Sequence, residues 1–276
     1  MGRQAIQDEL ILYGRRFTSR LLLGTARYDS PSLLADAIAA ADPALLTVSL
    51  RRQLSGSKEC GESFWNLLRE TKRTLLPNTA GCMTAQEAVK TACMARELFQ
   101  TNLIKLEVIG DEVSLQPDPF GLVEAANQLV KLGFQVLPYC TEDRVLCRRL
   151  MDVGCEVLMP WAAPIGTGQG PRNARALREL RERAPNIPLI VDAGIGLPSH
   201  ACQVMEWGFD GVLLNTAVSR ADNPVRMAGA FASAIKAGHS AFVAGPMIVQ
   251  EAAVSSTPEI GRPFSTGSST FLATAN

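Results

Sequence analysis

Short apolar segments alternate with amphipathic segments along the chain. The apolar segments are strand-sized and carry little polar alternation, which is typical of parallel strands covered on both faces. Eight of them occur, at 20–24, 45–50, 74–78, 103–108, 135–140, 156–160, 188–194 and 211–215. Each precedes a segment with helical periodicity. Eight consecutive strand–helix units without a domain-sized break predict an α/β protein with a single-domain (β/α)8 TIM barrel, in preference to an open doubly wound sheet.

The ends of the predicted helices and the change of pattern near the termini predict the domain organisation. Ser30 directly before Pro31 matches the N-cap and first-turn positions of a helix. We expect an N-terminal extension at 1–19, the barrel at 20–238 and a C-terminal tail at 239–276. The tail is rich in Ser, Thr, Gly and Pro and lacks periodicity, which is typical of a segment that is mobile or becomes ordered on a partner.

Composition excludes several classes of protein. The chain has 276 residues, a formal net charge of zero and no basic run, so we expect no nucleic-acid partner. It also lacks a signal-peptide core and a run of apolar residues long enough to span a membrane, which predicts a cytoplasmic protein. The seven cysteines form no CxxC motif and only two histidines are present, so we expect free thiols, no metal site and no cofactor.

Lys105 is the strongest candidate for a catalytic residue. Of the six lysines, it alone lies inside an apolar strand segment. Burial in a barrel interior lowers the pKa of a lysine toward the neutral amine, and a neutral amine can attack a carbonyl to form an imine. The alternative is an ion pair that Lys105 makes for packing alone.

Two carboxylates are candidates to act with Lys105. Glu107 is two residues further along the strand, so the period of two places it on the same face as Lys105, and both should point into the barrel. It can balance the ammonium charge and transfer protons during imine chemistry, or serve only as counter-ion. Asp192 ends the seventh strand segment, at the face where barrel enzymes carry catalytic residues, although an aspartate there can also cap a turn.

Glycine-rich or polar turns follow the last three strand segments and predict a phosphate site. They read APIGTGQG at 163–170, DAGIG at 192–196 and NTAVS at 215–219. Glycine lets backbone N–H groups approach an anion closely, and barrels often bind phosphate with the loops after the seventh and eighth strands. His200, at the start of the following helix, we expect to face solvent.

Several of these segments resemble the bacterial thiazole synthase family of thiamin biosynthesis, over about residues 20–238. The matching segments are LLPNTAGCMTAQEAV, NLIKLEVIGD, QPDP, GFQVLPYC, EVLMPWAAPIGTGQG, VDAGIGLPSHA and GVLLNTAV. The resemblance implies a condensation of 1-deoxy-D-xylulose 5-phosphate, dehydroglycine and sulfur from a small sulfur-carrier protein with a C-terminal thiocarboxylate. The product implied is the phosphorylated thiazole carboxylate. We also expect a homo-oligomer, of a size that the sequence leaves open.

The resemblance also assigns roles to individual residues. It implies that Lys105 forms the imine with the sugar ketone, and that Glu107 and Asp192 transfer protons. The positions that it implies for the sugar phosphate are Gly166, Ala193, Gly194, Asn215 and Thr216. The chain departs from the family pattern at Ala162 and Thr167, where we expect glycine and serine, and in the segment after Gly238.

Two other functions use the same features. An imine-forming aldolase would need the strand lysine and the phosphate site but no sulfur carrier. A barrel that only binds a phosphorylated sugar would need no nucleophile at Lys105.

Overall fold

A computed structural model of the protein describes residues 9–50 and 58–253, of which 58–63 as backbone only. The chain divides after Ala244 into two units, Met1–Ala244 and Gly245–Asn276. The first unit contains the barrel. In the second unit, the described residues 245–253 form neither helix nor strand, and residues 254–276 of the expected tail lie outside the described part of the chain.

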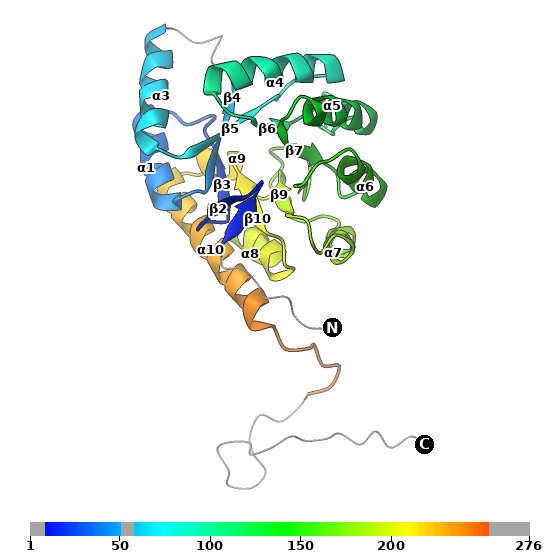
Figure 1. Ribbon diagram of the computed structural model, residues 1–276. Helices are drawn as coiled ribbons and strands as arrows, with labels where there is room; N and C mark the ends of the chain where they lie inside the picture. Colours follow the sequence, from blue (N-terminus) through cyan, green and yellow to red (C-terminus); the bar gives the residue numbers. More distant parts are fainter. Residues whose placement is uncertain (1–8, 51–57, 254–276) are drawn as a thin grey trace. The chain divides into compact units, whose positions relative to one another are not determined.

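The first unit contains an eight-stranded parallel barrel in which strands and helices alternate, as the sequence predicts (Figure 1). The strands of the barrel are β3 (Leu21–Gly24), β4 (Leu45–Ser49), β5 (Thr74–Asn78), β6 (Leu103–Leu106), β7 (Gln135–Cys140), β8 (Met159–Pro160), β9 (Ile190–Asp192) and β10 (Gly211–Leu214). Neighbours pair in the order β8-β7-β6-β5-β4-β3-β10-β9. A parallel bridge between Leu158 and Leu189 joins the two ends of this order and closes the barrel.

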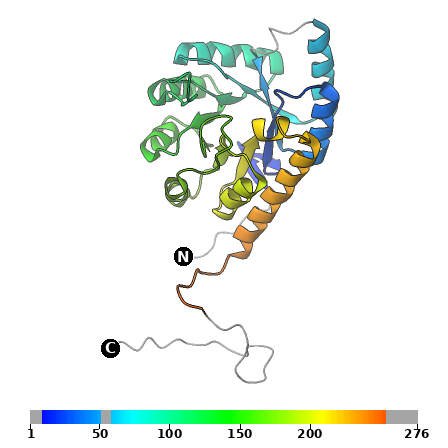
Figure 2. The same cartoon turned by 180° about the vertical axis from the view of Figure 1, so that it is seen from behind.

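Helices surround the strands, and the view from behind shows the same ring (Figures 1 and 2). They are α1 (Pro31–Ala41), α3 (Lys58–Thr71), α4 (Ala85–Phe99), α5 (Pro119–Lys131), α6 (Arg144–Asp152), α7 (Ala174–Arg183), α8 (Pro198–Glu206), α9 (Thr216–Ser219) and α10 (Pro224–Ala244). Ser30 caps α1 by accepting a hydrogen bond from the amide of Leu33, as expected. Helix α10 continues past Gly238 to Ala244, because the next glycine and proline after Gly238 are Gly245 and Pro246.

The described part of the N-terminal extension contains a β-hairpin, which the sequence analysis does not anticipate. Strands β1 (Leu10–Leu12) and β2 (Arg15–Phe17) pair antiparallel, and the two turn residues, Tyr13 and Gly14, both have positive φ. This is the arrangement of a type I′ hairpin turn. The hairpin buries Leu10 and Leu12 against the apolar interior of the barrel.

The interior of the barrel changes from apolar to polar along its axis. One layer consists of apolar side chains: Leu22, Leu45, Leu76, Leu103, Leu137, Met159, Ile190 and Leu213. Two residues further along the strands, toward their carboxyl ends, the same face carries Gly24, Thr47, Asn78, Lys105, Tyr139, Asp192 and Asn215. Successive residues of a strand point to opposite faces, so all of these positions face inward. The apolar layer closes one end of the barrel, and the polar layer defines the other end as the site.

Candidate active site

A cavity of about 1280 Å³ lies at the carboxyl ends of the strands. All eight residues that the sequence analysis proposes for catalysis or substrate binding line it: Lys105, Glu107, Gly166, Asp192, Ala193, Gly194, Asn215 and Thr216. They come from strands or turns that are far apart in the sequence. The structure therefore brings the candidate nucleophile, the candidate acids and the glycine-rich turns to one space.

Lys105 lies between two carboxylates in the wall of this cavity. Its Nζ is 2.6 Å from Oδ2 of Asp192 and 3.2 Å from Oε1 of Glu107. All three residues are buried, with exposed fractions of 6%, 3% and 5% for Lys105, Asp192 and Glu107. Ile104, on the opposite face of the strand, packs in the core between barrel and helices, so the strand period orients Lys105 inward as expected.

The ionisation of Lys105 differs from the expectation. Burial is the largest single effect and acts to lower the pKa of Lys105, but the charges of Asp192 and Glu107 together outweigh it. The pKa of Lys105 is therefore raised, and the expectation of a neutral amine in the unliganded protein is wrong. Burial has the largest effect on the pKa of Asp192 and raises it. The charge of Lys105 lowers this pKa and the charge of Glu107 raises it, so that the net shift is upward. Asp192 is thus both the nearer carboxylate and a better proton acceptor than an exposed aspartate.

The backbone around Glu107 is fixed by Thr79, a residue that the sequence analysis missed. The Thr79 hydroxyl donates to the carbonyl of Glu107 at 2.7 Å and accepts from its amide at 2.8 Å. Thr79 is fully buried and follows the end of β5. Because β6 ends at Leu106, these two hydrogen bonds hold Glu107 beside Lys105 where the strand pairing has stopped.

The turns after β8 and β9 pack backbone against backbone. A Cβ atom on Gly194 would lie 2.3 Å from the amide nitrogen of Ala163, and one on Gly196 would lie 2.3 Å from the carbonyl oxygen of Gly168. Gly194 has φ +78° and the preceding Ala193 has φ +72°, a conformation that is rare for alanine. Glycine at 194 and 196 is therefore required for the close packing of the two turns.

The two departures from the family pattern fit into this packing. The amide of Ala162 donates to the carbonyl of Ala193 at 3.2 Å. Both the amide and the hydroxyl of Thr167 donate to the carbonyl of Pro164, at 3.2 and 2.8 Å. Neither Ala162 nor Thr167 is among the residues that line the cavity.

The turn after β10 contributes Asn215 and Thr216, at the start of the short helix α9. A Cβ atom on Gly24 would lie 2.6 Å from the Cβ of Asn215, so glycine at this position leaves room for the asparagine. The Oδ1 atom of Asn215 is buried and accepts no hydrogen bond within the described part of the chain. Asn215 itself is among the residues that line the cavity.

Two further residues near the site were missed or misjudged. The ring of Tyr139 lies 5.7 Å from Nζ of Lys105, and its hydroxyl donates to the carbonyl of Leu115 at 3.3 Å. Strand periodicity could have placed Tyr139 on the inner face. His200 does not simply face solvent: its Nδ1 accepts from the amides of Gly196 and Leu197, both at 3.3 Å.

Comparison with known proteins identifies the family. The family model of the thiazole biosynthesis protein ThiG matches residues 11–258. The chain is 65% identical over 264 residues to the thiazole synthase of Paracidovorax citrulli (strain AAC00-1), covering 96% of this chain and 98% of the relative. It is 63% identical over 255 residues to the thiazole synthase of Neisseria meningitidis (strain MC58), covering 92% and 97%.

The chain belongs to the thiazole synthase family of thiamin biosynthesis.

Solved structures also match this chain. BexX of Amycolatopsis orientalis, in a complex with CysO, matches with a TM-score of 0.79 and 33% identity, covering 88% of this chain and 98% of that chain. The 3-hexulose-6-phosphate synthase of Salmonella typhimurium matches with a TM-score of 0.53 and 16% identity, covering 80% and 100%. The second match shows likeness of fold alone. Both matches agree with the observed fold, and the first is the more similar of the two.

Three further properties of the described residues concern metal clusters, membrane-spanning helices and the state of the cysteines. In residues 9–50 and 58–253, no three His, Cys, Asp or Glu side chains form a cluster that could hold a metal ion. None of the helices in the same ranges combines the length and apolar character that crossing a membrane requires. The six cysteines with described side chains are free thiols, and Cys60 lies outside the described side chains.

Proposed function

We propose that this thiazole synthase condenses 1-deoxy-D-xylulose 5-phosphate, dehydroglycine and sulfur from a thiocarboxylated carrier protein into the thiazole phosphate precursor of thiamin, through an imine on Lys105. The observation that carries the proposal is a buried lysine between two carboxylates in the wall of a cavity. Glycine-rich turns line the same cavity and suit a phosphate. The relative BexX occurs in a complex with a second protein, CysO, which supports a protein partner for this chain.

The first chemical step requires Lys105 to lose a proton. Asp192 accepts it, because its carboxylate is 2.6 Å from Nζ and its pKa is raised. The neutral amine then adds to the ketone carbon of the sugar, and the carbonyl oxygen leaves as water after receiving one proton from the Lys105 nitrogen and one from Asp192, which returns the proton that it accepted. One ammonium and one ketone thus give one iminium ion and one water. The positive charge remains between the two carboxylates.

The sugar phosphate binds on the opposite side of the cavity in this proposal. Backbone groups of Gly166, Ala193 and Gly194 face it, together with Asn215 and Thr216 at the start of α9. A phosphate held there orients the ketone toward Lys105, and such positioning is a large part of the rate enhancement in bimolecular reactions. Glu107 and Asp192 then transfer protons as the imine rearranges before sulfur enters.

Borohydride trapping tests the imine. The protein is incubated with 1-deoxy-D-xylulose 5-phosphate and borohydride, and the modified peptide is mapped by mass spectrometry. We expect one reduced adduct, on Lys105. The Lys90→Ala variant, which removes an exposed lysine of α4, should keep the adduct, and Lys105→Ala should lose it.

The same assay separates the alternative functions. A protein that only binds the sugar would give no adduct. An aldolase would give an adduct and a product that does not depend on the sulfur carrier. We expect thiazole formation only when the thiocarboxylated carrier and dehydroglycine are both added. A cytoplasmic location and a homo-oligomeric state remain predictions, which fractionation and size-exclusion chromatography with light scattering can test.

A further inference from the structure

Glu142 ties together the two ends of the glycine-rich loop after β8. Its Oε2 accepts a hydrogen bond from Nε1 of Trp161 at 2.5 Å, and its Oε1 accepts one from Nδ2 of Asn173 at 3.1 Å. Trp161 begins the loop and Asn173 ends it as the N-cap of α7. Glu142 itself lies in the turn between β7 and α6 and does not line the cavity. Glu142 therefore links the two ends of the loop from outside the site, in addition to the backbone hydrogen bond from the amide of Arg172 to the carbonyl of Ala162 at 3.1 Å.

The glycines of the loop make side-chain contacts at its two ends important for its shape. Its glycines at 166, 168 and 170 all have positive φ, and a chain with three such residues has little intrinsic stiffness. Inside the loop, the amide of Gly170 donates to the carbonyl of Gly194 at 2.8 Å, which sets the distance between the turns after β8 and β9. The position of Gly166 in the cavity wall thus depends on where the loop begins and ends.

The same network reaches the lysine. The rings of Trp161 and Tyr139 meet edge to face, with centroids 6.4 Å apart. The Tyr139 ring lies 5.7 Å from Nζ of Lys105, and its hydroxyl donates to the carbonyl of Leu115 on the loop after β6. Glu142 is therefore connected, through Trp161 and Tyr139, to Lys105 and to the loop after β6, and residues of both line the cavity.

We propose that Glu142 is a positioning residue for the sugar phosphate: its carboxylate holds Trp161 and Asn173 so that the loop after β8 keeps the shape that binds the phosphate. The identity of the ligand rests on the proposed function. Glu142 touches neither the cavity nor the reacting atoms, so it acts on affinity for the phosphorylated sugar and much less on the chemistry at Lys105.

A purely structural role is the alternative, because Glu142 also links α6 to α7 through its loop contacts. The chain offers a matched control for it. Arg144 of α6 pairs with Glu179 of α7 at 3.3 Å, and this link does not involve the loop. The Glu179→Gln variant should weaken the contact between the helices while leaving sugar-phosphate binding unchanged.

A graded set of variants separates the two hydrogen bonds. Trp161→Phe keeps a ring against Tyr139 but removes the N–H donor. Asn173→Asp keeps an N-cap oxygen for α7 but removes the donor and adds repulsion against Glu142. Glu142→Gln keeps one acceptor and the size of the side chain, whereas Glu142→Ala removes both acceptors. We expect the smallest effects from Glu142→Gln and the largest from Glu142→Ala.

Two measurements on the full-length protein test the proposal. Calorimetry gives the dissociation constants of 1-deoxy-D-xylulose 5-phosphate and of inorganic phosphate. Borohydride trapping at increasing sugar concentration gives the half-saturating concentration and the rate at saturation. For Glu142→Ala we expect affinity for both ligands to fall roughly 10- to 100-fold, since charge-assisted hydrogen bonds fix the loop. The saturating trapping rate should stay within about twofold of wild type, as expected for lost uniform binding.

Each outcome decides between the possibilities. Wild-type affinity in Glu142→Ala and Trp161→Phe overturns the proposal, and so does an equal loss of affinity in Glu179→Gln. If Glu142→Ala does not fold, Trp161→Phe and Glu142→Gln decide. If the wild type binds the sugar phosphate but gives no adduct, the imine is wrong, and the calorimetric comparison still tests Glu142. If the wild type binds neither ligand, both proposals are wrong.

Discussion

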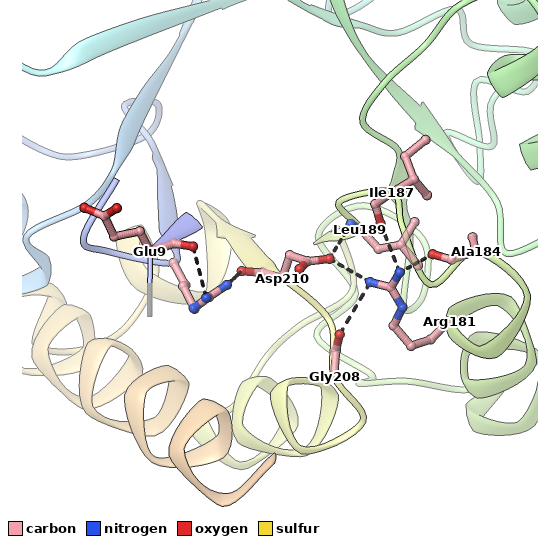
Figure 3. Close-up of polar contacts among 8 residues, drawn as sticks. Glu9, Arg181, Ala184, Ile187, Leu189, Gly208 and Asp210 are labelled. Atoms are coloured by element: carbon pink, nitrogen blue, oxygen red, sulfur yellow. Dashed lines mark hydrogen bonds and ion pairs between the residues drawn. The ribbon is translucent and has the colours of Figure 1, made fainter. Parts of the chain in front are cut away.

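Each end of the barrel carries buried or half-buried charged side chains. The groups that pair with these side chains differ between the two ends. At the amino ends of the strands, Arg20 donates to the carbonyl of Asp210 at 2.9 Å and to that of Glu9 at 3.3 Å. Arg181 pairs with Oδ2 of Asp210 at 2.7 Å, and this oxygen also accepts from the amide of Leu189 (Figure 3). At the carboxyl ends, Lys105 pairs with two carboxylate side chains instead.

The difference lies in what else the charged groups contact. Arg181 also donates to the carbonyls of Gly208, Ala184 and Ile187, which are fixed by the fold (Figure 3). Lys105, Glu107 and Asp192 are held by one another and line an open cavity. A charge satisfied by backbone groups stabilises one conformation, whereas charges satisfied by titratable side chains can exchange a proton when a ligand arrives. Similar ion pairs thus serve stability at one end and chemistry at the other.

The largest expected effect comes from replacing Lys105. Lys105→Ala and Lys105→Arg should lower thiazole formation on the order of 10⁴-fold or more, because the nucleophile is lost and a guanidinium stays protonated. Single-turnover assays with all three substrates measure this. Turnover within about tenfold of wild type in either variant would exclude an imine on Lys105.

The alanine variant should also change the dependence of stability on pH. Without the ammonium, Asp192 and Glu107 face each other, which raises the pKa of the pair in the folded variant above its value in the unfolded chain. A raised folded pKa contributes stability at low pH that is lost as pH rises through that pKa. Lys105→Ala should therefore unfold at a lower temperature than wild type at neutral pH, with a smaller difference near pH 4.

Asp192→Asn should separate activity from stability. We expect a loss of about 10²- to 10⁴-fold in the rate of imine formation, because Asp192 accepts the proton of Lys105. The folded pKa of Asp192 is raised, so its ionised form costs stability once the pH is above that pKa. The asparagine variant, in which Glu107 still pairs with Lys105, should be as stable as wild type or more so at neutral pH. Trapping kinetics and urea unfolding test both expectations.

A clear drop in stability for Asp192→Asn with an unchanged trapping rate would contradict the proposed difference between the two ends of the barrel. Asp192 would then act like Asp210, as a structural partner.

Much of the fold follows from local sequence. The apolar runs predict all eight strands, and the strand period predicts that Lys105 and Glu107 share the inner face. The glycine-rich or polar turns predict three of the loops that line the cavity, those after β8, β9 and β10, but not the lining loops after β3 and β5. These features depend on residues close together in the chain, so a single sequence contains them.

The parts that the sequence analysis missed depend on contacts between distant residues. The pKa of Lys105 is raised because Asp192, on another strand, lies 2.6 Å away, and no local pattern encodes that distance. Thr79 holds Glu107 across 28 positions, and Glu142 holds Trp161 across 19. The hairpin at Leu10–Phe17 was missed because its strands have three residues each and gain stability from the barrel interior.

Arg181→Ala tests the stabilising end of the barrel. It should lower the free energy of unfolding by about 2–4 kcal/mol, since it removes the ion-pair partner of Asp210, which keeps only the Leu189 amide at that oxygen, and a donor to several carbonyls. The reaction rate at a temperature where the variant is folded should match wild type. Arg175→Ala is the control: its side chain is 88% exposed and pairs with Glu179, so the free energy of unfolding should not change measurably. A loss of activity in folded Arg181→Ala would show that the two ends are coupled.

The smallest expected effect is a shift of the pH profile in Glu107→Gln. The rate of imine formation at low sugar concentration should rise with pH, because Lys105 must be neutral to react and its pKa in the unliganded protein is raised. Removing the negative charge of Glu107 destabilises the ammonium, so the pKa of Lys105 falls and the rising limb should move to lower pH by about one to two units. Trapping rates across the pH range measure the limb. Glu112→Gln, which removes an exposed carboxylate of the neighbouring loop, should leave the limb in place. An unmoved limb in Glu107→Gln would mean that Asp192 alone holds the proton on Lys105, and a shift to higher pH would contradict the charge assignment of the site.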